Sequence, residues 1–165
     1  MSTANAGVGV FAPDRLPRPD SWSAEVRHLL PLLPEDPVTL VGGSNGCSVA
    51  ARLAVENPHR VLRLVLAWPA TAGDPRVDAW TREQGAPEDM LAGETLRGLT
   101  DAELAGLRMP VSVLPAPGGP FHQRRTADAL LRLIPGAAEL PSSPEPPRPE
   151  FTPDGLVGTL AGLCP

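Results

Sequence analysis

Closely spaced metal ligands are missing from this sequence. Its 165 residues include two cysteines, Cys47 and Cys164, and three histidines, His28, His59 and His122, and no two of them have the spacing of a ligand pair. A structural metal site or a disulfide framework needs several such residues at short, regular intervals. We therefore expect neither a metal site nor a disulfide framework.

Basic clusters and long apolar runs are also missing. The chain has 14 basic and 19 acidic side chains, a net charge of −5, and no run of like charges. Binding to a phosphate backbone requires clustered basic side chains, so no nucleic acid partner is expected. No apolar segment reaches the roughly 18 to 20 residues that cross a bilayer, and residues 1–10 lack the basic and apolar regions of a signal peptide. These absences predict a soluble cytoplasmic protein with no membrane partner.

Proline, by contrast, is abundant, with 22 residues in the chain. Many of them fall in residues 141–153 (PSSPEPPRPEFTP). Each proline ring fixes its own backbone and restricts the preceding residue, so this stretch is predicted to be an extended loop. With 42% apolar residues, the chain has enough material for one domain over residues 1–165, with residues 1–7 as a flexible N-terminus.

Apolar runs alternate with segments of helical periodicity. Helices are predicted to begin at Asp20 or Ser21 and near Cys47, and later ones run through Ala127 and over residues 154–164. The alternation predicts an α/β fold, three-layer-like, with a mostly parallel sheet of about five strands. The predicted strands are VGVFA (8–12), VTLV (38–41), VLRLVLAW (61–68), VSVL (111–114) and AAEL (137–140).

A glycine-rich turn joins the second predicted strand to a predicted helix. The sequence Gly42-Gly43-Ser44-Asn45-Gly46 fits the pattern G-x-S-x-G in the strand–turn–helix context that gives this pattern its meaning. Ser44 is then the candidate nucleophile, and the Asn45 N–H a candidate oxyanion donor. Neither a P-loop nor a dinucleotide fingerprint is present, so no cofactor is expected.

This turn and the segments after it resemble the α/β-hydrolase superfamily. The resemblance extends through ENPHRVLRLVLAWPA (56–70), MPVSVLPAPGG (109–119) and LIPGAAEL (133–140) to PEF before the last helix. It covers most of the chain from about Val8, which is similar to the family's fourth strand. The resemblance implies a shortened hydrolase fold whose earlier strands, and the loop carrying a second oxyanion donor, are missing.

The usual catalytic triad of that family is not found at its usual places. The resemblance implies an acid in the loop after VSVL and a histidine in the loop after AAEL, but these positions hold Gly118-Gly119-Pro120 and a proline-rich stretch. His122, just after the first of these positions, is the candidate base, or else an ordinary loop histidine. Asp74, after the third strand, is a candidate acid or a solvated carboxylate.

Two functions therefore remain open. The chain is a small serine hydrolase that acts on an ester or thioester of a small molecule through Ser44 and His122, or it is a non-hydrolytic pseudoenzyme. Such a pseudoenzyme would bind a ligand or a partner, or would use the pocket for non-covalent chemistry. Strands such as VLRLVLAW read as buried on both faces, and the resemblance implies that only the last helix covers one of these faces. A homodimer or a hetero-complex is therefore also predicted.

Overall fold

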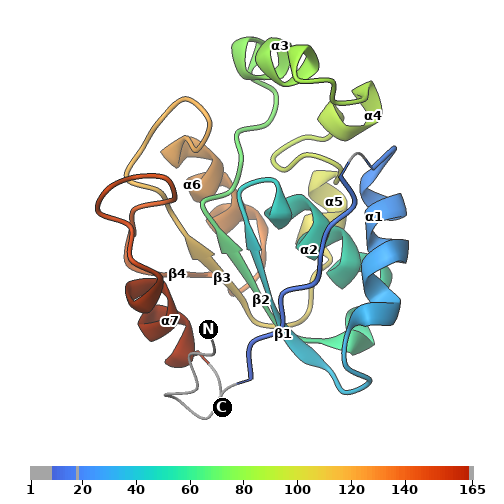
Figure 1. Ribbon diagram of the computed structural model, residues 1–165, viewed down its shortest axis with the longest axis vertical. Helices are drawn as coiled ribbons and strands as arrows, with labels where there is room; N and C mark the ends of the chain where they lie inside the picture. Colours follow the sequence, from blue (N-terminus) through green and yellow to red (C-terminus); the bar gives the residue numbers. More distant parts are fainter. Residues whose placement is uncertain (1–8, 18, 164–165) are drawn as a thin grey trace.

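The computed structural model describes residues 9–17 and 19–163 (Figure 1). Helices and strands alternate along the chain as the sequence predicts. In order they are α1 (Trp22–Leu29), η1 (Leu30–Leu32), β1 (Val38–Gly43), α2 (Gly46–Glu56), η2 (Pro58–Arg60), β2 (Val61–Ala67), α3 (Pro75–Glu83), α4 (Glu88–Leu91), α5 (Asp101–Ala105), β3 (Val111–Leu114), α6 (Arg124–Leu133), β4 (Ala138–Glu139) and α7 (Pro153–Ala161).

The four strands form one parallel sheet in the order β1-β2-β3-β4. Each strand follows its neighbour in sequence, so all the crossovers run in the same direction across the sheet. The carboxyl ends of the four strands therefore meet at one edge, and the loops that follow them lie together there. This arrangement confirms the predicted α/β class with a mostly parallel sheet.

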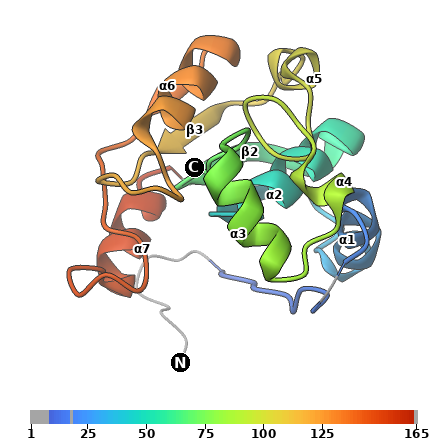
Figure 2. The ribbon, with the colours of Figure 1, turned by 90° about the horizontal axis from the view of Figure 1, so that it is seen from above.

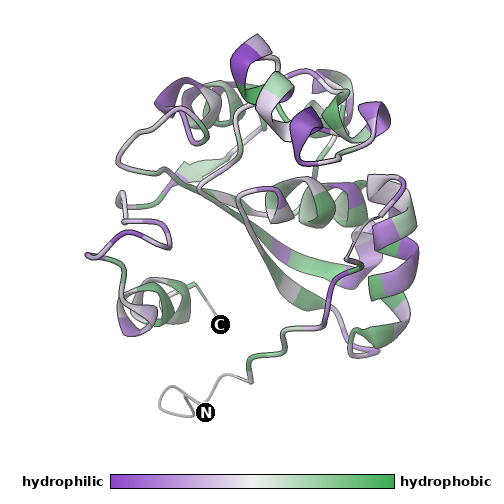
Figure 3. Cartoon of the chain, turned by 45° about the horizontal axis from the view of Figure 1, so that its top comes forward, coloured by the Kyte–Doolittle hydropathy of each residue, from purple (hydrophilic) through white to green (hydrophobic). Residues whose placement is uncertain are grey.

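One face of the sheet carries the larger hydrophobic core. Successive side chains of a strand point to opposite faces of the sheet. Leu64 and Leu66 of β2 point to this face, and so do Val111 and Val113 of β3. Helices α1, α2, α5 and α6 supply most of the other members of this core, and Met90 of α4 and Leu96 and Leu99 before α5 also belong to it. The strands are drawn largely in the hydrophobic colour, while polar residues lie on the outer sides of the helices (Figure 3).

The opposite face has a smaller core. Ala67 and Leu114 pack there with Trp68 and with Leu156 of α7, which Figure 2 shows on the other side of the sheet from α2 and α5. The side chain of Val41, which points to this face from β1, remains 45% exposed. This exposed apolar side chain is consistent with the predicted dimer or hetero-complex, which stays a prediction.

The prediction of a fifth strand at VGVFA is wrong for the residues described. Residues 9–12 are not in a strand, and Val8, with the predicted flexible residues 1–7, lies outside the described residues. Val10 and Phe11 are 74% and 57% exposed, and none of the described strands pairs with this segment. A strand needs a hydrogen-bonded neighbour, and Pro13, which follows, has no N–H to donate.

The turn after β1 depends on its glycines to different degrees. A Cβ at Gly42 would lie 2.7 Å from the carbonyl carbon of Gly46 and 2.8 Å from Cys47 Cα, inside the backbone of α2. A Cβ at Gly43 would only touch the Trp68 ring at 3.7 Å, and one at Gly46 would meet nothing within 4 Å. Gly42 is therefore the position where the strand and the helix approach too closely for a side chain.

Gly42→Ala is accordingly expected to destabilise the protein by about 1–3 kcal/mol, because the backbone of α2 must shift to make room. Gly46→Ala is the matched control, and we expect it to change the free energy of unfolding by less than about 1 kcal/mol. Urea unfolding followed by circular dichroism measures both. Equal unfolding midpoints for the two variants would contradict this account of the turn.

Candidate active site

Ser44 occupies the tip of the turn between β1 and α2. Its φ of 54° lies in the left-handed region, which few residues with a side chain adopt. The Ser44 N–H donates to the Ala67 carbonyl at the end of β2, and the Ser44 carbonyl accepts from Cys47 N–H, each at 3.0 Å. The turn is thus fixed on both sides, and strain of this kind is typical of functional positions.

His122 lies against this serine. It comes from the irregular loop between β3 and α6, and its Nε2 is 2.9 Å from Ser44 Oγ although the two residues are 78 positions apart in sequence. The side chain of His122 is 17% exposed. A hydroxyl within hydrogen-bond distance of an imidazole is the arrangement that proton transfer from the hydroxyl requires.

Glu145 lies on the other side of the same imidazole. Its Oε1 is 3.7 Å from His122 Nδ1, longer than a hydrogen bond, and forms an ion pair with Arg148 Nε at 2.9 Å. The residue is 93% buried, since its exposed fraction is 7%, and its second oxygen, Oε2, has no hydrogen-bond partner among the described residues. The carboxylate favours the tautomer with the proton on Nδ1, which leaves Nε2 free to accept the Ser44 hydroxyl proton.

The loop that carries Glu145 is the proline-rich stretch of residues 141–153. Trp68, at the end of β2, donates from Nε1 to the Ser143 carbonyl at 2.8 Å. The indole of Trp68 also packs edge-on against Phe151, with 6.0 Å between the ring centroids. Arg148 adds a hydrogen bond to the Gly118 carbonyl in the loop that carries His122. These contacts hold the proline-rich loop against the carboxyl edge of the sheet.

The protonation states suit this arrangement. Burial lowers the pKa of His122 below its ordinary value of about 6.5, and the charge of Arg148 acts in the same direction, while the negative charge of Glu145 opposes them. Burial alone would raise the pKa of Glu145, but the hydrogen bond and charge of Arg148 outweigh it, and that pKa is lowered. At neutral pH the imidazole is therefore neutral and the carboxylate ionised.

Asn45 and Cys47 differ in what they can do. The Asn45 N–H, at the N-terminus of α2, donates to no acceptor in the part of the chain that the structure describes, so it is free to bind an anion. The Cys47 thiol is fully buried and donates to the carbonyls of Gly42 and Ala67. Burial raises the pKa of this thiol, so Cys47 is not a thiolate nucleophile.

No family model matches this chain, but a curated protein is similar to it in sequence. The 2-hydroxy-6-oxo-2,4-heptadienoate hydrolase of Pseudomonas putida is 33% identical over 126 residues, which cover 67% of this chain and 45% of that enzyme. The chain thus spans about half the length of this curated relative.

Solved structures show the same fold. A hydrolase from Pseudomonas aeruginosa matches with a TM-score of 0.64 and 19% identity, covering 93% of this chain and 75% of that one. An α/β-hydrolase from Sphaerobacter thermophilus matches with a TM-score of 0.62 and 20% identity, covering 90% and 79% of the two chains. These structures show that the chain has the α/β-hydrolase fold. Together with the sequence similarity to a hydrolase, they support a relationship to the α/β-hydrolase superfamily, which confirms the resemblance in the sequence.

Glu145 is not predicted from the sequence. The resemblance implies a histidine in the loop after the last strand and an acid in the loop after β3, whereas the structure has His122 after β3 and Glu145 after β4. Its position in the sequence could have indicated this role, because Glu145 follows the last strand and the loops after all the strands meet at one edge of the sheet. Asp74, the other candidate acid, instead caps α3 and accepts hydrogen bonds from Gln123 and Arg125.

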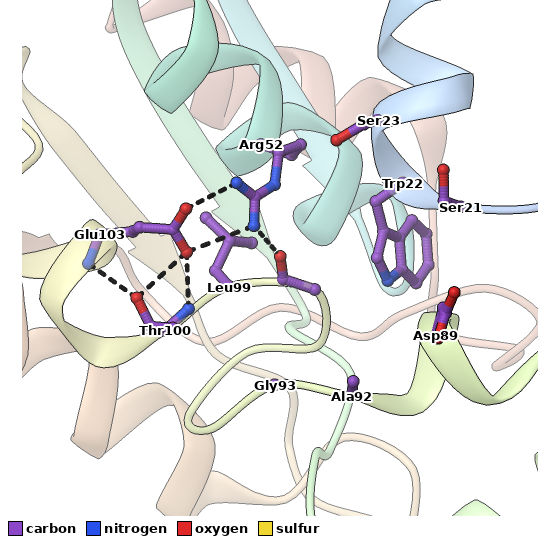
Figure 4. A pocket seen from close by; sticks show the side chains of 11 residues that line it. Ser21, Trp22, Ser23, Arg52, Asp89, Ala92, Gly93, Leu99, Thr100 and Glu103 are labelled. Atoms are coloured by element: carbon purple, nitrogen blue, oxygen red, sulfur yellow. Dashed lines mark hydrogen bonds and ion pairs between the residues drawn. The ribbon is translucent and has the colours of Figure 1, made fainter.

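A hollow of about 270 Å³ lies elsewhere on this chain, between α1, α2 and the segment before α5 (Figure 4). The cationic side chain in its lining, the partly buried Arg52, is already bonded to the Glu103 carboxylate at 2.7 Å and to the Gly98 carbonyl. Trp22 likewise donates to the Met90 carbonyl. The polar groups of Arg52 and Trp22 are thus used in hydrogen bonds within the protein and are not available to a ligand. Ser44 and His122 therefore remain the candidate site.

The described residues contain no group of three or more histidine, cysteine or acidic side chains placed to hold a metal ion. They also contain no helix that is long and apolar enough to cross a membrane.

The charges around His122 predict how its pKa responds to substitution. Glu145→Gln removes the negative charge that raises this pKa, so the pKa is expected to fall further below about 6.5. Arg148→Gln removes a positive charge, so the pKa is expected to rise. NMR titration of the imidazole signals, assigned with His122→Gln, measures both shifts. Shifts of the same sign in the two variants would show that these charges do not govern His122.

Proposed function

We propose that this chain is a serine-dependent hydrolase of small-molecule acyl esters or thioesters. Ser44 is the nucleophile, His122 the general base and Glu145 the carboxylate that stabilises the imidazole when it takes up a proton. The observation that carries this proposal is the 2.9 Å separation of Ser44 Oγ and His122 Nε2. The order of roles along the chain differs from that expected of the family, but a triad is defined by geometry rather than by sequence order.

In the first half of the reaction, the Ser44 oxygen attacks the carbonyl carbon of the substrate while its proton moves to His122 Nε2. The carbonyl π bond opens and its electron pair becomes an oxyanion. The oxyanion then re-forms the carbonyl, the bond to the leaving oxygen or sulfur breaks, and His122 Nε2 returns the proton to that atom. The products of this half are an acyl-Ser44 and a free alcohol or thiol.

In the second half, a water molecule takes the place of the alcohol. His122 Nε2 removes a proton from this water as its oxygen attacks the acyl carbon. When the second tetrahedral intermediate collapses, the Ser44 oxygen leaves and regains that proton. A carboxylic acid is released and the free enzyme is restored.

The free N–H of Asn45 supports stabilisation of the oxyanion. It lies next to the nucleophile at the start of α2, an 11-residue helix whose N-terminus carries a partial positive charge. One donor of this kind is typically worth about 3 kcal/mol of transition-state stabilisation.

An exposed pair of aromatic side chains near His122 favours a small, partly apolar molecule as the substrate. Trp80 on α3 and Phe121, directly before His122, pack with 4.9 Å between their ring centroids and are 49% and 40% exposed. Figure 1 shows α3 above the edge of the sheet. The matched hydrolase from Pseudomonas putida is named for a small keto acid, which makes a short acyl compound the first substrate to try.

A fluorophosphonate probe is expected to form one adduct with the intact protein, because it traps a serine whose hydroxyl proton is removed by a base. Ser44→Ala should abolish the adduct. His122→Ala should slow labelling by about 100- to 10,000-fold, the usual contribution of a general base. Intact-mass spectrometry measures the adduct and its rate of formation.

The matched control is Ser23→Ala, which removes an α1 serine whose hydroxyl donates to Glu56. This variant should label as the native chain does. No adduct on a native chain shown to be folded by circular dichroism would reject serine-dependent hydrolysis and favour the alternative, a non-hydrolytic protein that binds a ligand or a partner. If the adduct forms, hydrolysis of p-nitrophenyl esters of increasing acyl length would define the substrate range of the enzyme.

A further inference from the structure

Thr71, in the loop after β2, lies beneath the segment that carries His122. Its side chain is completely buried, and no part of the proposed reaction uses it. We propose that Thr71 is a positioning residue that fixes the backbone of His122 so that Nε2 faces Ser44. This inference rests on the proposed function, in which His122 is the general base.

Two hydrogen bonds from Thr71 bracket His122. The Thr71 N–H donates to the Phe121 carbonyl at 2.8 Å, and Thr71 Oγ1 accepts from the Gln123 N–H at 3.1 Å. The first bond holds the peptide plane before His122 and the second holds the plane after it. Since these two planes define the φ and ψ of His122, the imidazole keeps only its two side-chain torsions.

The loop of His122 needs such support because it has no regular structure of its own. Residues 115–123 lie between β3 and α6, and Gly118 has a φ of 125°, which ordinary residues rarely adopt. The carboxylate of Glu145 is 3.7 Å from the imidazole and shares its oxygen with Arg148, so it holds the ring only loosely. The bonds from Thr71 are shorter and come from a buried residue.

Asp74 makes a second and weaker connection between the same two loops. Its Oδ2 accepts from Gln123 Nε2 and from Arg125, each at 3.2 Å, but its side chain is 22% exposed. Neither of these bonds reaches the peptide groups on either side of His122. The proposal therefore assigns the positioning role to Thr71 and not to Asp74.

Substitution of Thr71 tests the role of its hydroxyl. Thr71→Val keeps the shape of the side chain but removes the acceptor for the Gln123 N–H, and Thr71→Ser keeps the hydroxyl. We expect Thr71→Val to lower kcat by about 10- to 100-fold with KM changed less than about twofold, since a misplaced catalytic group costs rate rather than binding. Thr71→Ser should stay within about threefold of the native kcat.

Thr126→Val is the matched control. Thr126 is also buried, three residues after Gln123, and its hydroxyl makes no hydrogen bond to another described residue. This variant should leave kcat unchanged. If Thr71→Val does not fold, Thr71→Ala replaces it, because it removes the same acceptor without adding bulk. A native kcat for the folded hydroxyl-free variant, or equal losses in that variant and Thr71→Ser, would overturn the proposal.

A second readout separates this inference from the proposed function. If the native chain neither hydrolyses esters nor reacts with the probe, the proposed function fails, and the NMR signals of the His122 imidazole then decide about Thr71. Altered shifts and an altered titration in Thr71→Val, restored in Thr71→Ser, would support the positioning role. Native signals in Thr71→Val would reject it whatever the activity of the chain.

Discussion

The parallel arrangement of the four strands is the constraint on which the rest of this structure depends. Because every strand runs in the same direction, every loop that follows a strand leaves the sheet at the same edge. The loop after β1 supplies Ser44, that after β2 supplies Thr71, that after β3 supplies His122, and that after β4 supplies Glu145. Ser44 and His122, 78 positions apart in sequence, thereby come within hydrogen-bond distance.

The same constraint explains how base and acid can exchange their places along the chain. A triad requires an imidazole between a hydroxyl and a carboxylate, and it does not specify which loop supplies each group. β3 and β4 are hydrogen-bonded neighbours, so the loops after them lie side by side at the edge. In the proposed site the loop nearer to Ser44 carries the imidazole and the farther loop carries the carboxylate, which preserves the order hydroxyl, imidazole, carboxylate in space.

The strands, helices and turns could be predicted where the sequence has an apolar periodicity or characteristic turn residues. Contacts that depend on the path of irregular loops could not be predicted. Apolar runs predict β1 to β4, and the glycines around Ser44 predict the turn, because each pattern reflects a local requirement. His122 could be proposed as the base from its place after a strand. Glu145 was missed because its proximity to His122 depends on how the proline-rich loop folds back, and that path is set by distant contacts such as that of Trp68 with Ser143. The failed strand at residues 9–12 has a similar cause, since a strand depends on a neighbour that its own sequence does not show.

Arg148 reveals how the electrostatics of the proposed site are balanced. By binding Glu145 it keeps the carboxylate ionised inside the protein, where an unpaired charge would be costly. The same positive charge lowers the pKa of His122 and so keeps the imidazole neutral and able to accept a proton. The consequence is that Glu145 divides its interactions between Arg148 and His122, and the 3.7 Å separation from the imidazole reflects this division. A carboxylate shared in this way orients the ring weakly, so the orientation of His122 must come from the backbone that carries it.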